Sequence, residues 1–300
     1  MSHPRARYAL VGAAGQLGSD LVKTFDGAGA LIPLTHHEID ILDAAAAERT
    51  LAALHPTHVI NTAAWNLVDR AEDEPRAAFA LNGEAVGTLA ATCERLGACL
   101  VHFSTDYVFD GVKRAPYVED DPPNPLSAYG ESKLAGERLA RERCSRALIV
   151  RVAALFGIAR SSGKGGSNFV ETMLRAAGAG RPLRVVGDQV TAPSYTPDVA
   201  RAVWRLIASA PPGIYHVSGS GETTWFDFAR EIFRREGIAP SLTAVSAEEF
   251  GARARRPPYS VLAHRALRAL GHPELPSWQA GLASYLAERR ALSVTAPRGS

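Results

Sequence analysis

The chain has 300 residues, 46% of them hydrophobic, so it can bury a large core as one large domain or two unequal ones. The formal net charge is +2 with acids and bases interspersed, which gives no sign of a nucleic-acid or membrane partner. Three cysteines form no CxxC pair and no apolar run reaches about 18 residues. We therefore expect a cytoplasmic protein without disulfides, a thiolate metal site or a membrane span.

The first predicted strand, residues 8–11, leads into a glycine-rich turn and then a helical pattern. The turn reads GAAGQLG, a G-x-x-G-x-x-G spacing. Glycines let a backbone approach a pyrophosphate, and the following helix N-terminus favours its negative charge. A plain strand-to-helix turn is the alternative. The position at the start of the chain favours cofactor binding, which we assign to Gly12, Gly15, Gln16, Leu17 and Gly18.

The second predicted strand, residues 30–35, ends where NAD-binding units carry an acid for the adenosine ribose. Thr35 and His36 occupy that place, and neither repels a 2′-phosphate. We therefore expect NADPH to be admitted, with NADH as a further option. Asp40 and Ile41 are placed to border the adenine. An equally open interpretation of His36 and His37 is that they are exposed loop residues.

The third and fourth predicted strands end in small or hydroxyl-bearing residues. Residues 59–61 precede Ala63, Ala64 and Trp65, which we assign to the cofactor, and a polar loop is expected over 65–73. A helix is predicted over 75–96, and a strand over 99–103 precedes Thr105. A hydroxyl at the carboxyl end of a central parallel strand points into the ligand crevice. Thr105 is therefore a candidate for binding a substrate carbonyl.

A helix that begins near residue 127 carries Tyr129 and Lys133 four positions apart, hence on one face. A nearby ammonium stabilises a phenolate, so Lys133 would lower the pKa of Tyr129 and make it a usable general acid. A surface pair on an amphipathic helix is the alternative. Thr105 and the glycine loop favour the catalytic interpretation.

The order of elements predicts an α/β fold with a doubly wound parallel Rossmann-type sheet. Strands near 8, 31, 58 and 99 and over 147–152 place an NAD(P)-binding domain at 1–152, its sheet completed by elements near 183–217. Residues 153–292 are expected to form mainly a smaller, interleaved substrate-binding lobe, with 293–300 as a disordered tail. Its predicted helices cover 168–177, 197–207, 225–235 and 278–290, and its strands cover 183–186 and 213–217.

Several stretches together resemble the extended short-chain dehydrogenase/reductases, and within them the dTDP-4-dehydrorhamnose reductase family. The resemblance runs from about Tyr8 to the C-terminal helix. The most specific stretches are VHFSTDYVFDG from Val101, PYVEDDPPNPLSAYGESKLAGE from Pro116, VVGDQVTAPSYTPDVA from Val185 and RRPPYSVL from Arg255.

The resemblance implies reduction by NAD(P)H of the 4-keto group of a nucleotide-linked 4-keto-6-deoxyhexose, with dTDP-4-dehydrorhamnose giving dTDP-rhamnose. It makes Tyr129 the acid, while Lys133 tunes it and holds the nicotinamide ribose. Thr105 positions the keto oxygen and Asp106 contacts the sugar or assists proton transfer. For the substrate diphosphate we expect a clamp formed by Arg256 with Asn168, because a guanidinium matches phosphate geometry.

One departure from the family concerns the substrate. Where the family has RTSWVYG, residues 151–157 read RVAALFG, so Ala154 replaces a tryptophan, and the loop 158–166 is longer. A reductase for a different nucleotide-deoxysugar therefore stays an alternative. So does a non-catalytic cofactor-binding regulatory subunit, although the presence of Thr105, Tyr129 and Lys133 favours an enzyme. No metal is expected, and a homodimer is left open.

Overall fold

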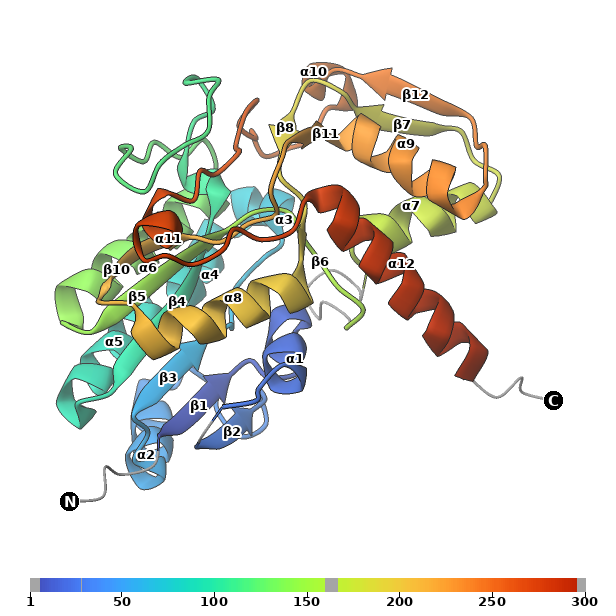
Figure 1. Ribbon diagram of the computed structural model, residues 1–300. Coiled ribbons are helices and arrows are strands. Elements are labelled where there is room, and N and C mark those ends of the chain that lie inside the picture. Colours follow the sequence, from blue (N-terminus) through green and yellow to red (C-terminus); the bar gives the residue numbers. More distant parts are fainter. Residues whose placement is uncertain (1–5, 28, 160–166, 296–300) are drawn as a thin grey trace.

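A central parallel sheet organises the computed structural model, which describes residues 6–27, 29–159 and 167–295 (Figure 1). The strand order is β10-β5-β4-β3-β1-β2. All neighbouring strands run parallel, which confirms the predicted doubly wound sheet. The bounds are β1 (Arg7–Val11), β2 (Ala30–Leu34), β3 (His58–Asn61), β4 (Cys99–Thr105), β5 (Ala147–Val152) and β10 (Gly213–His216).

Helices cover both faces of this sheet because successive strand residues point to opposite sides. One face packs against α2 (Ala44–Leu54), α5 (Ala85–Leu96) and α6 (Ala128–Arg143), as the core around Val59, Leu100 and Ile149 shows. The other face packs against α1 (Gln16–Lys23), α8 (Thr196–Ser209) and α11 (Arg265–Ala269), around Ile60 and Val101. The carboxyl ends of the strands are left for ligands.

A second group of elements lies beyond the carboxyl ends of the strands (Figure 1). It contains α7 (Phe169–Gly178), α9 (Trp225–Glu236), α10 (Ala247–Phe250) and α12 (Trp278–Thr295). Short strand pairs join them: β7 (Leu183–Val186) with β12 (Leu242–Val245), β6 (Leu155–Phe156) with β9 (Ser194–Tyr195), and β8 (Val190–Thr191) with β11 (Thr223–Thr224). A separate core includes Phe156, Phe228 and Tyr285.

The structure differs from the sequence prediction in several elements. The strand β7 does not extend the central sheet, because it pairs with β12, whereas β10 does join it. The polar loop expected over 65–73 contains the helix α3 (Val68–Asp73). The single helix expected over 75–96 is divided into α4 (Pro75–Phe79), a π-helix (Ala80–Glu84) and α5. The expected tail is helical up to Thr295, while 296–300 and loop residues 160–166 lie outside the described residues.

None of the helices in the described ranges is long and apolar enough to cross a membrane.

A buried ion pair joins α6 to the centre of the sheet. Arg151 of β5 donates to both carboxylate oxygens of Glu137 at 2.7 and 2.9 Å, and both side chains are almost fully buried. The guanidinium also lies over the Phe109 ring and 3.5 Å from His216 Nε2 of β10. Since an unpaired buried charge is costly, this pairing fixes α6 against β5 and β10.

Candidate active site

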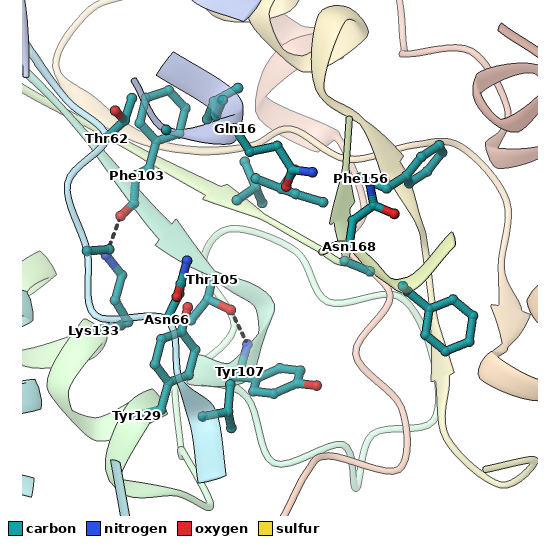
Figure 2. Close-up of a pocket in the computed structure, with 18 of the residues that line it drawn as sticks. Gln16, Thr62, Asn66, Phe103, Thr105, Tyr107, Tyr129, Lys133, Phe156 and Asn168 are labelled. Carbon is teal, nitrogen blue, oxygen red and sulfur yellow. Dashed lines mark hydrogen bonds between the residues drawn. The ribbon is translucent and has the colours of Figure 1, made fainter. Parts of the chain in front are cut away.

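A cavity of about 960 Å³ lies between the carboxyl ends of the central strands and the second group of elements (Figure 2). Such a volume suits a large ligand. Every residue that the sequence assigned to cofactor or substrate lines it except Trp65: Gly12, Gly15, Gln16, Leu17, Gly18, Thr35, Asp40, Ile41, Ala63, Ala64, Thr105, Asp106, Tyr129, Lys133, Ala154, Asn168 and Arg256.

The glycine loop after β1 requires glycine for steric reasons. Gly12 has φ +80°, and a Cβ there would lie 2.6 Å from Thr62 Oγ1. A Cβ on Gly18 would lie 2.3 Å from the carbonyl oxygen of Gly12. Gly15 is the N-cap of α1, and no side chain caps this helix. The loop and the uncapped helix N-terminus fit a pyrophosphate, which needs backbone N–H donors at close approach.

The turn after β2 contains a carboxylate that the sequence analysis missed. The backbone N–H and the hydroxyl of Thr35 donate to Glu38 Oε2 at 2.7 and 2.5 Å. These hydrogen bonds hold the pKa of Glu38 below its ordinary value. The ionised carboxylate is thereby bound to Thr35, and Glu38 does not line the cavity although His36 and His37 do.

Tyr129 and Thr105 meet at the cavity wall. Ser127 caps α6 by accepting from the Gly130 N–H at 3.2 Å, which places Tyr129 in the first turn. Figure 2 shows the Tyr129 hydroxyl directed toward Thr105. Burial raises the pKa of Tyr129 to about 12, with a further contribution from the Asp106 carboxylate. The phenol therefore holds its proton at neutral pH and can act as a donor.

Lys133 lies one turn further along α6. Its Nζ donates to the Phe103 carbonyl oxygen at 2.6 Å (Figure 2), and burial lowers the pKa of Lys133 to about 8, opposed by Glu137. The sequence analysis expected this ammonium to lower the pKa of Tyr129. The structure gives the opposite direction for Tyr129, because burial of the phenol dominates and the ammonium is directed at a β4 carbonyl.

Trp65 does not line the cavity, and its backbone is hydrogen-bonded to Asn82 of the π-helix. The Asn82 side chain accepts from Trp65 N at 2.9 Å and donates to Trp65 O and to Ser132 Oγ at 3.0 Å each. The indole N–H of Trp65 donates instead to the Leu67 carbonyl. Sequence reasoning missed Asn82, since a single asparagine inside a helical pattern carries no signal. It links the strand β3 loop to α6.

Asp106 follows Thr105 directly and is buried. Its Oδ1 accepts from the Thr105 hydroxyl at 3.0 Å and its Oδ2 from the Ser260 hydroxyl at 2.5 Å. Burial raises the pKa of Asp106 to about 6, opposed by these two hydrogen bonds. Both oxygens thus have protein partners, whereas the sequence analysis expected a sugar contact or a proton-transfer role.

The two residues expected to clamp a diphosphate already have partners as well. Arg256 donates to both oxygens of Asp69 at 2.8 and 3.0 Å. Asn168 caps α7 and donates to the Gly157 carbonyl at 2.7 Å. The charge of Arg256 is therefore largely neutralised where it meets the cavity.

A group of apolar residues lines the lobe side of the cavity. Ala154, between β5 and β6, has a positive φ of 41°. Phe169, Trp225 and Phe228 line the same side, and the Phe169 and Phe228 rings stack with centroids 5.5 Å apart. The sequence analysis missed these three aromatic residues. The pattern that could have indicated them is their position in the first turns of α7 and α9.

Within residues 6–27, 29–159 and 167–295, no group of three or more His, Cys, Asp or Glu side chains is arranged to hold a metal ion.

A glycine loop after β1, with a threonine at the end of β4 and a Tyr/Lys pair on the next helix, defines a short-chain dehydrogenase/reductase. The sequence model described as "RmlD substrate binding domain" matches residues 7–291.

Among similar proteins, SpsK of Bacillus subtilis, a spore coat polysaccharide biosynthesis protein, is 42% identical over 93% of this chain and 96% of its own. The dTDP-4-dehydrorhamnose reductase of Streptomyces griseus is 41% identical over 93% of each chain. The crystal structure of the Bacillus anthracis dTDP-4-dehydrorhamnose reductase in complex with NADP superposes with a TM-score of 0.90 at 36% identity, covering 95% of this chain and 100% of that one. The chain belongs to the dTDP-4-dehydrorhamnose reductase family.

Proposed function

We propose that the protein reduces the 4-keto group of a nucleotide-linked 4-keto-6-deoxyhexose with NADPH, converting dTDP-4-dehydrorhamnose to dTDP-rhamnose. The observation that carries this is the convergence of Tyr129, Thr105 and Lys133 with the glycine loop on one cavity. Relatives named for this activity, one of them crystallised with NADP, support the choice of substrate and cofactor.

When bound, the dihydronicotinamide supplies a hydride, that is, the two electrons that reduce the C4 carbonyl. Tyr129 then gives its proton to the resulting O4 alkoxide, so that one C–H and one O–H bond form and a phenolate remains. The nearby ammonium of Lys133 favours the negative charge of that phenolate. Thr105 lies beside Tyr129 at the cavity wall.

Gly12, Gly15, Gln16, Leu17 and Gly18 would hold the cofactor pyrophosphate, with Asp40 and Ile41 at the adenosine end. For the substrate diphosphate we retain Arg256 and Asn168, which line the cavity. Arg256 would exchange at least part of its contact with Asp69 for phosphate oxygens. The division into an NAD(P)-binding domain at 1–152 and a substrate lobe mainly at 153–292 stays a proposal.

A cytoplasmic setting also stays a proposal, supported by three free cysteines, of which Cys93 and Cys144 are buried. A homodimer stays a prediction that light scattering on the purified protein decides.

The test is an assay of NADPH oxidation with a panel of nucleotide-linked 4-keto-6-deoxy sugars. We expect turnover with dTDP-4-dehydrorhamnose. Turnover with another sugar alone would favour the alternative that Ala154 suggests. Cofactor binding without turnover on any sugar would favour the regulatory-subunit alternative and contradict the proposed function.

A further inference from the structure

Behind Thr105 lies a short chain of buried hydrogen bonds that the catalytic scheme does not use. The Thr105 hydroxyl donates to Asp106 Oδ1, and the Ser260 hydroxyl donates to Asp106 Oδ2. The three residues are 6%, 3% and 2% exposed. Ser260 lies 154 positions from Asp106 in the chain, so the contact exists only in the folded protein.

These contacts determine which way the Thr105 hydroxyl points. A hydroxyl has one proton and two lone pairs. The proton goes to Asp106, and one lone pair accepts from the Tyr107 N–H at 3.2 Å. The remaining lone pair is left open at the cavity wall, where Figure 2 shows the Tyr129 hydroxyl directed toward Thr105. The position of the Asp106 carboxylate therefore sets the orientation of the group that lies beside the acid.

Ser260 is itself held rigidly. The Ser260 backbone N–H donates to the Val190 carbonyl oxygen at 2.9 Å, and the Val190 N–H donates to the Pro258 carbonyl oxygen at 2.9 Å. The same segment packs on Gly111, where a Cβ would lie 2.7 Å from Pro258 Cδ. The hydroxyl thus reaches Asp106 from a backbone that is paired on β8 and in tight contact with the loop after β4.

We propose that Ser260 is a positioning residue for catalysis: it anchors the Asp106 carboxylate, which fixes the Thr105 hydroxyl beside Tyr129. This rests on the proposed function. Without Ser260, Oδ2 of a buried carboxylate loses its donor, and such a carboxylate rotates or takes up a proton. In either case Asp106 no longer orients Thr105, although every group that contacts substrate or cofactor is still present.

The test compares Ser260→Ala, Asp106→Asn and the double variant in steady-state kinetics, with NADPH binding measured separately. We expect Ser260→Ala to lower kcat about tenfold, the usual effect of losing one hydrogen bond to a charged group. KM and the NADPH dissociation constant should stay within about twofold, because no binding contact is removed. The double variant should lose no more than Asp106→Asn alone, since Ser260 acts through Asp106.

The matched control is Ser218→Ala. Ser218 is fully buried and lies 2.9 Å from His264 Nε2, but it does not line the cavity. The kcat of Ser218→Ala should equal that of the wild type. Ser260→Thr keeps the hydroxyl and should therefore retain the turnover that Ser260→Ala loses. Equal kcat in Ser260→Ala and Ser218→Ala, or additive losses in the double variant, would overturn the role of Ser260. Wild type that reduces no sugar of the panel would instead contradict the proposed function.

Discussion

The two walls of the cavity are built differently. The catalytic wall, comprising the glycine loop, Thr105, Tyr129 and Lys133, comes from the ends of long parallel strands and from α6. Directional hydrogen bonds hold its polar groups, as those of Lys133 and Thr105 show. The lobe wall, comprising Ala154, Phe169, Trp225 and Phe228, comes from short strands and helices and is apolar. Directional hydrogen bonds fix one geometry, whereas apolar packing tolerates substitution of one apolar side chain by another. Changes in the first wall should alter rate, and changes in the second should alter substrate choice.

The largest expected effect is that of Tyr129→Phe on the catalytic wall. Removing the proton donor should lower kcat by about 10²- to 10⁴-fold, the usual contribution of general acid catalysis. The NADPH dissociation constant should change little. Steady-state kinetics and fluorescence titration measure the two quantities. Equal turnover in variant and wild type would exclude Tyr129 as the acid.

Lys133→Met should lower kcat/KM by roughly 10²-fold, because it removes a charge that stabilises the phenolate and, as proposed, a ribose contact. Unlike Tyr129→Phe, it should also weaken NADPH binding. Lys113→Met is a suitable control, since Lys113 is an exposed lysine paired with Asp121. An unchanged NADPH dissociation constant in Lys133→Met would restrict Lys133 to the electrostatic role.

The pH dependence should separate Lys133 from Tyr129. The pKa of Lys133 is lowered to about 8, so its positive charge is present below that pH and is lost above it. The pKa of Tyr129 is raised to about 12, so the phenol keeps its proton over the same range. kcat/KM should therefore fall about tenfold for each pH unit above 8. A profile that stays flat up to pH 10 would contradict this assignment.

On the lobe wall, Ala154→Trp should narrow the range of sugars. An indole brings roughly 150–250 Å² of contact surface into the cavity. We expect relative kcat/KM to shift about tenfold against bulkier or differently configured sugars, with dTDP-4-dehydrorhamnose retained. Identical relative values across the panel would mean that Ala154 does not determine specificity.

Ala154→Gly is the matched control for that wall. Glycine adopts the positive φ of this position without strain, so the variant should be more stable by about 1 kcal/mol in thermal or denaturant unfolding. Its relative kcat/KM values should follow those of the wild type. A loss of stability would show that the alanine methyl group makes packing contacts that outweigh the backbone strain.

The smallest expected effect concerns the choice between NADPH and NADH. NADPH should serve at least as well as NADH, because Thr35 holds the Glu38 carboxylate. Thr35→Val removes the hydroxyl donor and should lower the NADPH:NADH ratio of kcat/KM about three- to fivefold, the size of one exposed charge interaction. Adding Glu38→Gln should restore the ratio. Failure to restore it would show that Glu38 does not influence the choice.

Much of the catalytic wall was predictable from sequence because it follows a local rule. Buried apolar runs predict parallel strands, and the residues after each strand share one edge of the sheet. The strand over 147–152 was predicted with its observed bounds, and Thr105, Tyr129 and Lys133 do line one cavity. The pKa direction of Tyr129 was wrong because it depends on burial, which spacing along a helix does not give.

The lobe and the supporting contacts were less predictable because they depend on distant partners. The strands β6, β8, β9 and β11 have two residues each, too short for any periodicity, and β12 is defined by its pairing with β7. Asn82 reaches Ser132 across 50 positions and Ser260 reaches Asp106 across 154. No local pattern specifies such contacts.

The strand β10 joins the central sheet beside β5 only after the chain has passed through most of the lobe. A fragment that ends at Val152 would leave the edge of β5 unpaired and Arg151 without its neighbour His216. Recombination between relatives at a single point after Val152 would therefore pair β5 and β10 from different parents. A chimaera with two junctions keeps Gly213–His216 from the same parent as the sheet that it completes.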